Sequence, residues 1–385
     1  MAARNLLFIS HYTGLGGGER IQLNLMSALD PARFRVHLVC PRDGQFPQAA
    51  RERGVQVHIL PFRGVTTVFI PDLWMRLPIS RRLAALVRAH DIHLIHSDYH
   101  ALPFAVAAGK AAGIPVVWNA IGWWFPVYPW QRRFFTRRVD RIVAITRAVR
   151  DRWLGEPPLM RAERVPIIIP GVDPDEFHPG AADGSAIRRQ VGIGPDVSLV
   201  TLLARFQHVK GHDVFHAMAQ RVHAALPSAR FVVAGENVFG ASKDEAYKRA
   251  MLDQAAHDPV LRETLTHLGF QDAREVLAAA NVLVCPSRFE SLGMVHLEAM
   301  AMGVPVVSTD NGGPAETVVD GATGFLVPPD DPAALAERVL RLLRDPDLRA
   351  QLGKAGRQRV LAHFTARGYA ESMADLFERT LAEHR

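Results

Sequence analysis

The stretch PSRFESLGMVHLEAMAMGVP, residues 286–305, lies between two apolar segments and carries two carboxylates, Glu290 and Glu298. The run before it, Val282–Cys285, is short and apolar, which predicts a buried strand that ends at Pro286. We expect an apolar helix to begin at Gly293. A strand, a loop and a helix in this order form the repeating unit of parallel α/β sheets.

The same alternation of apolar runs and helical patterns extends along most of the chain. The expected strands are residues 6–10, 35–40, 55–60, 92–96, 115–119, 141–145 and 165–169, and then 199–204, 230–234, 265–269, 282–285, 305–308 and 324–327. A stretch rich in Pro, Gly and Asp, at about 170–195, separates the two series and is typical of a linker. We therefore predict an α/β fold with two Rossmann-like domains that face each other across a cleft. The predicted domains are residues 1–175 and 176–362, and a C-terminal helix, 363–385, is expected to pack back on the first domain.

Composition supports a globular chain with two cores. The chain has 385 residues, of which 48% are hydrophobic and 22% charged. Its two cysteines are far apart and suit neither a disulfide framework nor a metal site. We expect no signal peptide, since the apolar run near the N-terminus is short, and no apolar stretch is long enough for a membrane span. These features predict a cytoplasmic protein.

The charge is divided unevenly between the two halves. Residues 1–180 contain 23 Lys and Arg against 14 Asp and Glu, whereas the remainder contains 22 against 25. All six tryptophans also lie in the first half. The two halves are therefore expected to bind different partners.

The two carboxylates of the opening stretch flank a potential anion site. The start of a helix presents unpaired backbone N–H groups and a partial positive charge, here from Ser291, Leu292, Gly293 and Met294. Eight residues of helix rise roughly 12 Å and nearly return to the same face. A diphosphate with a sugar on each side fits this arrangement, because carboxylates accept hydrogen bonds from paired hydroxyls. The alternative is that Glu298 only faces water.

Two further loops resemble phosphate sites. Arg205 and Lys210, the latter followed by Gly211, come after a predicted strand, and two cations there suit a diphosphate. Near the N-terminus, the loop that contains Gly17 and Gly18 follows a strand and opens a helix. It does not match the dinucleotide fingerprint Gly-x-Gly-x-x-Gly. It could also be a plain turn before a helix.

Taken together, these motifs resemble the retaining glycosyltransferases of family four, which have the GT-B fold. The resemblance covers about residues 14–327, and the motifs that carry it are Gly17-Gly18-x-Arg20, Gly171-Val-Asp173, Arg205 with Lys210-Gly211, Pro286-Ser287, Glu290-x7-Glu298, Gly303-x-Pro305 and Asn311-Gly-Gly-Pro-Ala-Glu316. Many relatives have a histidine where this chain has Asn119, and Asn-Gly where it has Pro170-Gly171. The first departure puts the sugar preference in doubt.

The resemblance implies a role for each motif. Arg205 and Lys210 would neutralise the leaving diphosphate. Glu298 would hold the ribose and Glu290 the hydroxyls of the donor sugar. Gly16–Gly18, which include Gly17 and Gly18, would line the cleft against the donor diphosphate and the acceptor. It also implies no metal and no cofactor, with a nucleotide-diphosphate sugar as the donor substrate. Backbone groups near Phe270 are expected to recognise the base.

The acceptor side is less defined. His96, Asp98 and His100 follow a strand and could contact the acceptor or make ordinary loop hydrogen bonds. Residues 118–153, which include Asn119 and Trp123, interleave aromatic side chains with arginines. The aromatics could stack on sugars, dock on anionic lipid at the inner face of the membrane, or form core. No nucleic-acid module is visible.

We therefore predict a metal-independent retaining glycosyltransferase, a hexosyltransferase of polysaccharide or glycoconjugate biosynthesis. Its acceptor would be a glycan, a lipid-linked sugar or a small molecule. One alternative is a nucleotide-sugar epimerase or hydrolase on the same scaffold. A second is a non-catalytic subunit that binds a nucleotide-sugar, and the broken glycine fingerprint disfavours a dehydrogenase.

Overall fold

The computed structural model describes residues 3–64, 76–122, 129–237 and 242–384. The chain forms two compact units. The first unit comprises residues 1–170 together with 366–385, and the second comprises residues 171–365. The chain thus crosses between units at 170/171 and 365/366, where we predicted 175/176 and 362/363.

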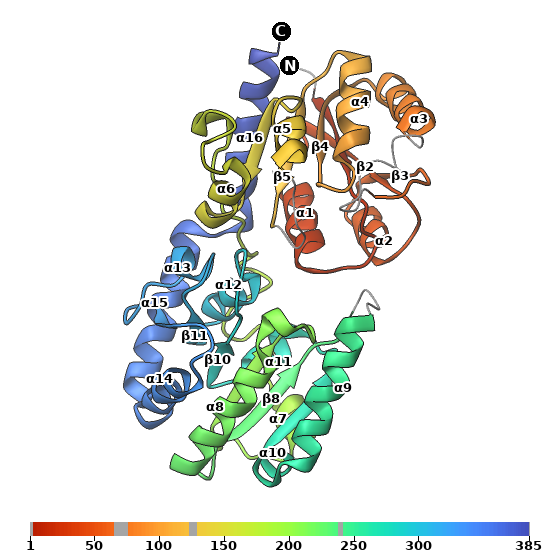
Figure 1. Cartoon of the computed structure of the whole chain (residues 1–385). Helices are drawn as coiled ribbons and strands as arrows, with labels where there is room; N and C mark the ends of the chain where they lie inside the picture. The colour runs from red at the N-terminus through yellow and green to blue at the C-terminus, as the bar shows by residue number, and fades with distance from the viewer. Residues whose placement is uncertain (1–2, 65–75, 123–128, 238–241, 385) are drawn as a thin grey trace. The chain divides into compact units, whose positions relative to one another are not determined.

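The first unit contains a parallel six-stranded sheet in the order β3-β2-β1-β4-β5-β6, of which β2 to β5 are labelled in Figure 1. Its strands are β1 (Arg4–Ile9), β2 (Phe34–Cys40), β3 (Gln56–Ile59), β4 (Ile92–Ser97), β5 (Val116–Ala120) and β6 (Arg141–Ala144). Its helices are α1 (Gly17–Ala28), α2 (Gln45–Glu52), α3 (Arg76–Ala89), α4 (Leu102–Ala112), α5 (Pro129–Thr136), α6 (Arg147–Leu154), the short 3-10 helix η2 (Ala162–Arg164) and α16 (Ala366–Glu383). Most strands are buried on both faces, as expected for a parallel sheet covered by helices.

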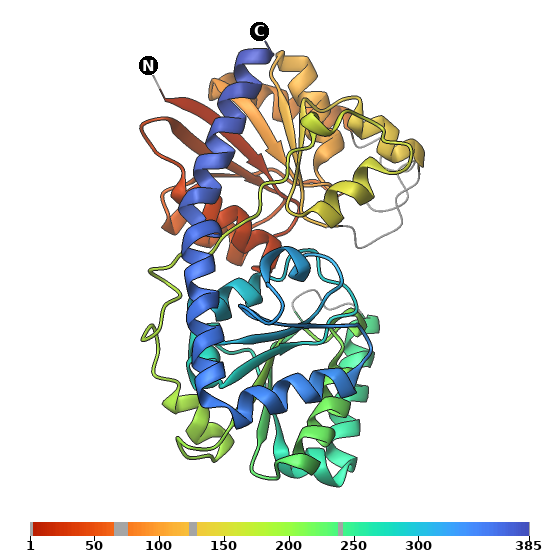
Figure 2. The same ribbon diagram turned by 90° about the vertical axis from the view of Figure 1, so that its left-hand side faces the viewer.

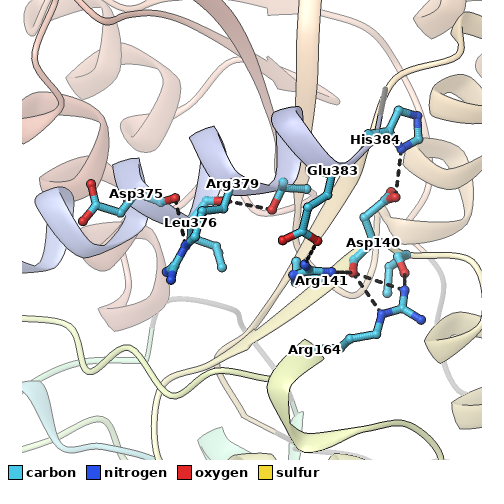
Figure 3. A network of polar contacts seen from close by, with 10 residues as sticks. Asp140, Arg141, Arg164, Asp375, Leu376, Arg379, Glu383 and His384 are labelled. Carbon is cyan, nitrogen blue, oxygen red and sulfur yellow. Dashed lines mark hydrogen bonds and ion pairs between the residues drawn. The ribbon is translucent and has the colours of Figure 1, made fainter.

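The C-terminal helix α16 packs on the first unit, alongside α1 (Figure 2). It buries Phe377 against Phe8 and Phe34. Polar contacts near its end fasten it further, as Figure 3 shows. Glu383 pairs with Arg141, and His384 Nδ1 lies 3.0 Å from Asp140 Oδ1. This segment belongs to the first unit although it is the end of the chain.

The second unit contains another parallel six-stranded sheet, in the order β12-β11-β10-β7-β8-β9. Its strands are β7 (Leu199–Leu203), β8 (Arg230–Ala234), β9 (Leu265–Gly269), β10 (Val282–Cys285), β11 (Val306–Thr309) and β12 (Gly324–Val327). Its helices are α7 (Ser185–Val191), the 3-10 helix η3 (His208–Lys210), α8 (His212–Ala225), α9 (Ser242–His257), α10 (Pro259–Thr264), α11 (Ala273–Ala279), α12 (Met294–Ala301), α13 (Pro314–Thr317), α14 (Pro332–Arg344) and α15 (Pro346–His363). The central core lies between β7, β8 and β10 and the helices α8 and α14.

One expected strand, residues 165–169, does not form. Ile167 makes only an isolated bridge with Ala144. The physical reason is proline: Pro166 has no N–H to donate to a ladder, and Pro170 ends the segment. The other twelve expected strands are present within two residues at each end.

Candidate active site

The strand order of the second unit creates a switch point between β7 and β10. The connection from β7 leads to β8 on one side of it, whereas β10 lies on the other side. In open α/β sheets, ligands bind outside the carboxyl ends of the strands where the order reverses in this way. The two motifs singled out in the sequence, around Lys210 and around Glu290, follow these two strands.

Lys210 and Glu290 form an ion pair at this switch point. The Nζ atom of Lys210 lies 2.6 Å from Oε2 of Glu290, and both side chains are largely buried, with 19% and 13% of their surface exposed. Ser287 donates a weaker hydrogen bond, of 3.3 Å, to the same carboxylate oxygen. The structure therefore brings together two of the three residues predicted to be catalytic.

The environment keeps Glu290 ionised. Burial alone would raise the pKa of Glu290, but the charge of Lys210 and its hydrogen bond outweigh burial and hold this pKa below its ordinary value. His296 and Ser287 add smaller effects in the same direction. At neutral pH the Glu290 side chain that contacts Lys210 is therefore a carboxylate.

The loop after β11 fixes the backbone of Glu290. The N–H of Glu290 donates to Asn311 O at 3.2 Å, and the N–H of Gly313 donates to Glu290 O at 2.8 Å. A Cβ atom on Gly312, whose φ is 95°, would lie 2.1 Å from Glu290 O. Only glycine fits there, so the Asn-Gly-Gly motif serves as a close backbone support for Glu290.

Helix α12 begins where the sequence predicts. Its N-cap is Gly293, with a φ of 84°, and a Cβ atom there would lie 2.0 Å from His296 Nδ1. Ser291 and Leu292, which precede the helix, are buried. Glu298 is 9% exposed, so the alternative that it only faces water is wrong.

Two groups near the site were not singled out in the sequence. His296 is fully buried and its Nε2 lies 3.1 Å from Ser308 Oγ. Burial lowers the pKa of His296 to about 4, although Glu290 opposes this shift, so the ring is neutral. The sequence did offer one indication of this residue, because His296 comes three residues after Gly293 and so lies on the first turn of the predicted helix.

The second missed group is an ion pair that joins the same two loops. Arg288 Nη2 lies 2.6 Å from Asp213 Oδ2 and also contacts Asp330 at 2.8 Å. Arg288 Nη1 donates to His208 O at 2.7 Å, just before Lys210. Arg288 therefore holds the Lys210 loop against the Glu290 loop. No local sequence pattern indicates this pairing.

The remaining residues predicted in the second unit lie at the same edge of the sheet. Arg205 lies two residues after the end of β7, and Phe270, which is 72% exposed, directly follows β9. Met294 is the first residue of α12. Their predicted roles toward a donor stay predictions.

The first unit has its own switch point, between β1 and β4. Asp98 joins the loops that follow these strands, because its two carboxylate oxygens accept the N–H groups of His11 and Ala101, both at 2.8 Å. The hydroxyl of Tyr12 lies 2.9 Å from His100 Nε2. A small pocket of about 30 Å³ opens here, lined by Tyr12, Asp98, His100 and Asn119 among others.

Asn119 stands out in this pocket. It is 2% exposed, and neither its side-chain oxygen nor its nitrogen has a hydrogen-bond partner within the described part of the chain. An unpaired buried amide is costly, so this side chain is suited to a ligand that supplies polar groups. Contacts of Asp98, His100 and Asn119 with an acceptor stay predictions.

The prediction that His96 contacts the acceptor needs correction. Its ring lies in the core beside Phe8 and Phe377, with centroid distances of 4.5 and 5.8 Å, and the residue is 1% exposed. Burial lowers the pKa of His96 to about 3, so it is neutral. From this position the side chain cannot reach a ligand, because α16 covers that face of β4.

The glycine loop becomes part of a helix. Gly17 and Gly18 form the first turn of α1, whose N-cap is Gly16, and Glu19 Oε2 accepts the N–H of Gly16 at 3.0 Å. A Cβ atom on Gly18 would lie 2.6 Å from Ile121 Cδ1. This contact explains the glycine at 18 by packing, and the predicted role toward a diphosphate stays a prediction.

The aromatic and basic segment 118–153 is divided. Trp118 and Trp153 are buried with ring centroids 4.4 Å apart, so for these two the core interpretation is confirmed. Trp130 is 47% exposed. Trp123 lies outside the described residues. Among the helices that the structure describes, none is both long and apolar enough to cross a membrane.

Sequence comparisons assign the family. Residues 183–359 match the family model of glycosyl transferases group 1, and residues 15–176 match that of glycosyltransferase family 4. The chain is 32% identical over 278 residues to the alpha-maltose-1-phosphate synthase of Mycolicibacterium smegmatis. The aligned region covers 69% of this chain and 70% of that protein. The chain belongs to the family 4 glycosyltransferases. The protein is therefore an enzyme of sugar transfer.

A further relative and two solved structures are consistent with membership of this family. A GDP-mannose-dependent alpha-(1-6)-phosphatidylinositol monomannoside mannosyltransferase of M. smegmatis is 28% identical over 86% of both chains. Anabaena Alr3699/HepE, solved with UDP and glucose, superposes with a TM-score of 0.81 at 21% identity, over 97% of this chain and 99% of that one. Sucrose-phosphate synthase from Thermosynechococcus elongatus has a TM-score of 0.76 at 23% identity, over 99% and 100%. The fold is thus that of the GT-B glycosyltransferases.

Proposed function

We propose that this glycosyltransferase moves a sugar from a nucleoside-diphosphate sugar to an acceptor hydroxyl, with retention of configuration and without a metal ion. The observation that carries the proposal is the Lys210–Glu290 pair at the β7/β10 switch point, directly before the start of α12. A cation, an ionised carboxylate and a helix N-terminus converge there, which is what a sugar diphosphate requires.

The diphosphate would lie against the backbone N–H groups of residues 291–294. Lys210 and Arg205 would neutralise the charge that develops on it as the bond to the sugar breaks, a role that a divalent cation fills in other transferases. Glu298 would accept hydrogen bonds from the ribose hydroxyls. Glu290 would accept them from the sugar, and its pair with Lys210 holds it ionised for that purpose.

The transfer step is proposed as a front-face exchange. The bond between the anomeric carbon and the phosphate oxygen breaks, and its electron pair goes to the diphosphate. The acceptor oxygen bonds to the same face of the anomeric carbon, and its proton goes to the departing phosphate oxygen. No protein nucleophile is required, and the Glu290 carboxylate is already engaged by Lys210.

Donor and acceptor classes follow from the relatives as candidates. GDP-mannose in the name of one relative and UDP in the HepE complex make UDP- and GDP-sugars the first donors to test. The phosphatidylinositol mannoside in that relative's name makes a lipid-linked glycan the first acceptor to test. Such an acceptor would place the enzyme in the cytoplasm, at the inner face of the membrane. Asn119 and His100 would then contact acceptor or sugar hydroxyls in the first unit.

The test measures donor binding and transfer separately. Thermal unfolding is followed with UDP, GDP, ADP and their sugar conjugates, and product is followed with and without acceptor. Lys210→Ala and Glu290→Ala should abolish transfer, whereas the matched surface variants Lys354→Ala and Glu337→Ala, both exposed, should retain it. An epimerised nucleotide-sugar formed without acceptor would favour an epimerase, and free sugar formed without acceptor would favour a hydrolase. Binding of a nucleotide-sugar with no turnover under any acceptor would favour a non-catalytic subunit.

A further inference from the structure

Three histidines gather in the first unit, away from the pocket described above. His37 lies on β2, His58 lies on β3, and His90 follows the end of α3. One ring nitrogen from each lies within 4.8 Å of the other two. His37 is buried, and the other two are partly exposed, so the cluster is open to solvent on one side.

The rings are held close to one another. His37 Nδ1 lies 3.1 Å from His58 Nε2, and these two rings are stacked with an interplanar angle of 5°. The His90 ring centroid lies 4.6 Å from that of His58 and 5.1 Å from that of His37. Two nitrogens bound to one tetrahedral zinc ion at about 2.0–2.1 Å each would lie about 3.3 Å apart. The 3.1 Å separation is therefore near that of two ligands of one ion.

The chemistry of the three side chains suits a metal. Burial and the neighbouring imidazoles lower the pKa of His37 to about 4, and the pKa of His58 is also lowered by burial and by His90. Neutral imidazole is the form that binds Zn²⁺ and similar ions. Three histidine nitrogens with one open position make a tetrahedral donor set that a water molecule completes.

We propose that His37, His58 and His90 bind one divalent transition-metal ion of the zinc type. The ion would fasten the edge strand β3 and the end of α3 to β2. The three ligand atoms lie within 4.8 Å of one another, so a small rotation of the partly exposed rings would bring them to the spacing of ligands on one ion.

The proposed ion site and the pocket of the first unit lie at opposite ends of the sheet. Asn5, near the start of β1, donates its side-chain N–H to His90 O at 2.8 Å, so His90 lies toward the amino ends of β1 and β4. The pocket with Tyr12 and Asn119 follows the carboxyl ends of the same sheet. The ion is therefore expected to raise the stability of the first unit and to leave the transfer rate unchanged.

The test uses the full chain without an affinity tag, freed of metal by a chelator and then titrated with Co²⁺. We expect one Co²⁺ per chain with the strong visible absorption of tetrahedral cobalt, and its displacement by Zn²⁺. Zinc should also raise the unfolding midpoint by a few degrees. His58→Gln and His90→Gln should each weaken binding by at least about 10-fold, since even outer partners of metal ligands cost that much.

Controls keep the outcome decisive. Two histidine substitutions outside the cluster serve as controls. His93→Gln changes a residue close to His90 in the chain, and His257→Gln changes an exposed histidine of α9. Both variant proteins should bind Co²⁺ as the unchanged protein does. All variants are compared in chelator first, to show that each folds without metal. Absence of stoichiometric binding, or binding that His58→Gln and His90→Gln leave intact, would overturn the proposal. The three rings would then be a hydrogen-bonded cluster only.

Discussion

The Nζ atom of Lys210 contacts the carboxylate of Glu290 at 2.6 Å, although 80 residues separate them in the chain. Both side chains are largely buried, and the contact with Lys210 holds the pKa of Glu290 below its ordinary value. The pair forms because β7 and β10 are neighbours in the sheet and the loops after them meet.

Lys210→Met should destabilise the second unit in a pH-dependent way. The pKa of Glu290 is held below its ordinary value in the folded protein. The pair therefore contributes its full stabilisation to the free energy of unfolding above the unfolded pKa of a glutamate, about 4.3. This stabilisation is lost as the pH falls through the folded pKa. At pH 7 the variant leaves a buried carboxylate unpaired, which costs about 3 kcal/mol. Calorimetric unfolding at pH 7 and pH 4 should show a smaller difference between variant and unchanged protein at pH 4. An equal difference at both would contradict the pairing.

Gly293→Ala should lose donor binding and lower stability. The φ of Gly293 is 84°, and the added Cβ would also meet His296 at 2.0 Å. Gly192, with a φ of 73° and open space around its Cβ, is the matched control, because Gly192→Ala carries only the backbone strain of about 1–2 kcal/mol. Thermal unfolding with nucleotide should distinguish them. If both variants lost the same stability, the contact with His296 would be of no consequence.

Asn119→Leu should keep stability while it impairs transfer. The amide of Asn119 is buried without a partner among the described residues. Such an unsatisfied group costs the folded state about 1–3 kcal/mol, so replacing it with an apolar side chain removes that cost. A ligand hydroxyl that pairs with this amide would lose its contact, and KM should rise. Steady-state kinetics and thermal unfolding are measured on the same preparations. A clear loss of stability with unchanged KM would show that the amide is structural.

Phe377→Ala should destabilise the first unit selectively. Phe377 is fully buried against Phe8 and Phe34, and truncation of such a side chain costs about 3–5 kcal/mol. All six tryptophans of the chain lie before residue 171, so tryptophan fluorescence reports on the first unit. Its denaturant midpoint should fall, while Leu361→Ala, which changes an exposed side chain of α15, should leave it unchanged. An unaltered midpoint for Phe377→Ala would mean that α16 adds little to this core.

The local features of the fold were predictable from the sequence. Apolar runs such as Val282–Cys285 became strands, and Gly293 begins α12, because strand periodicity and helix capping depend on neighbours in the chain. The segment 165–169 was the exception, since its prolines remove ladder donors. The positions of Lys210, Glu290 and Asn119 at strand ends were also predictable.

What surrounds each side chain depended on the tertiary structure. His96 was predicted to contact a ligand, yet α16, from the far end of the chain, buries it beside Phe377. The Asp213–Arg288 pair, like the meeting of His37, His58 and His90, joins separate elements.

The sequence by itself thus determined the alternation of strands and helices, the strand-end loops and the residue types they carry. Only the tertiary structure decided which of these loops meet, so that Lys210 and Glu290 form one buried pair and His96 becomes core. The physical reason is that local patterns report burial and backbone conformation along the chain. Contacts between distant residues are set by strand order and by which helix covers which face, and no short stretch of sequence encodes these.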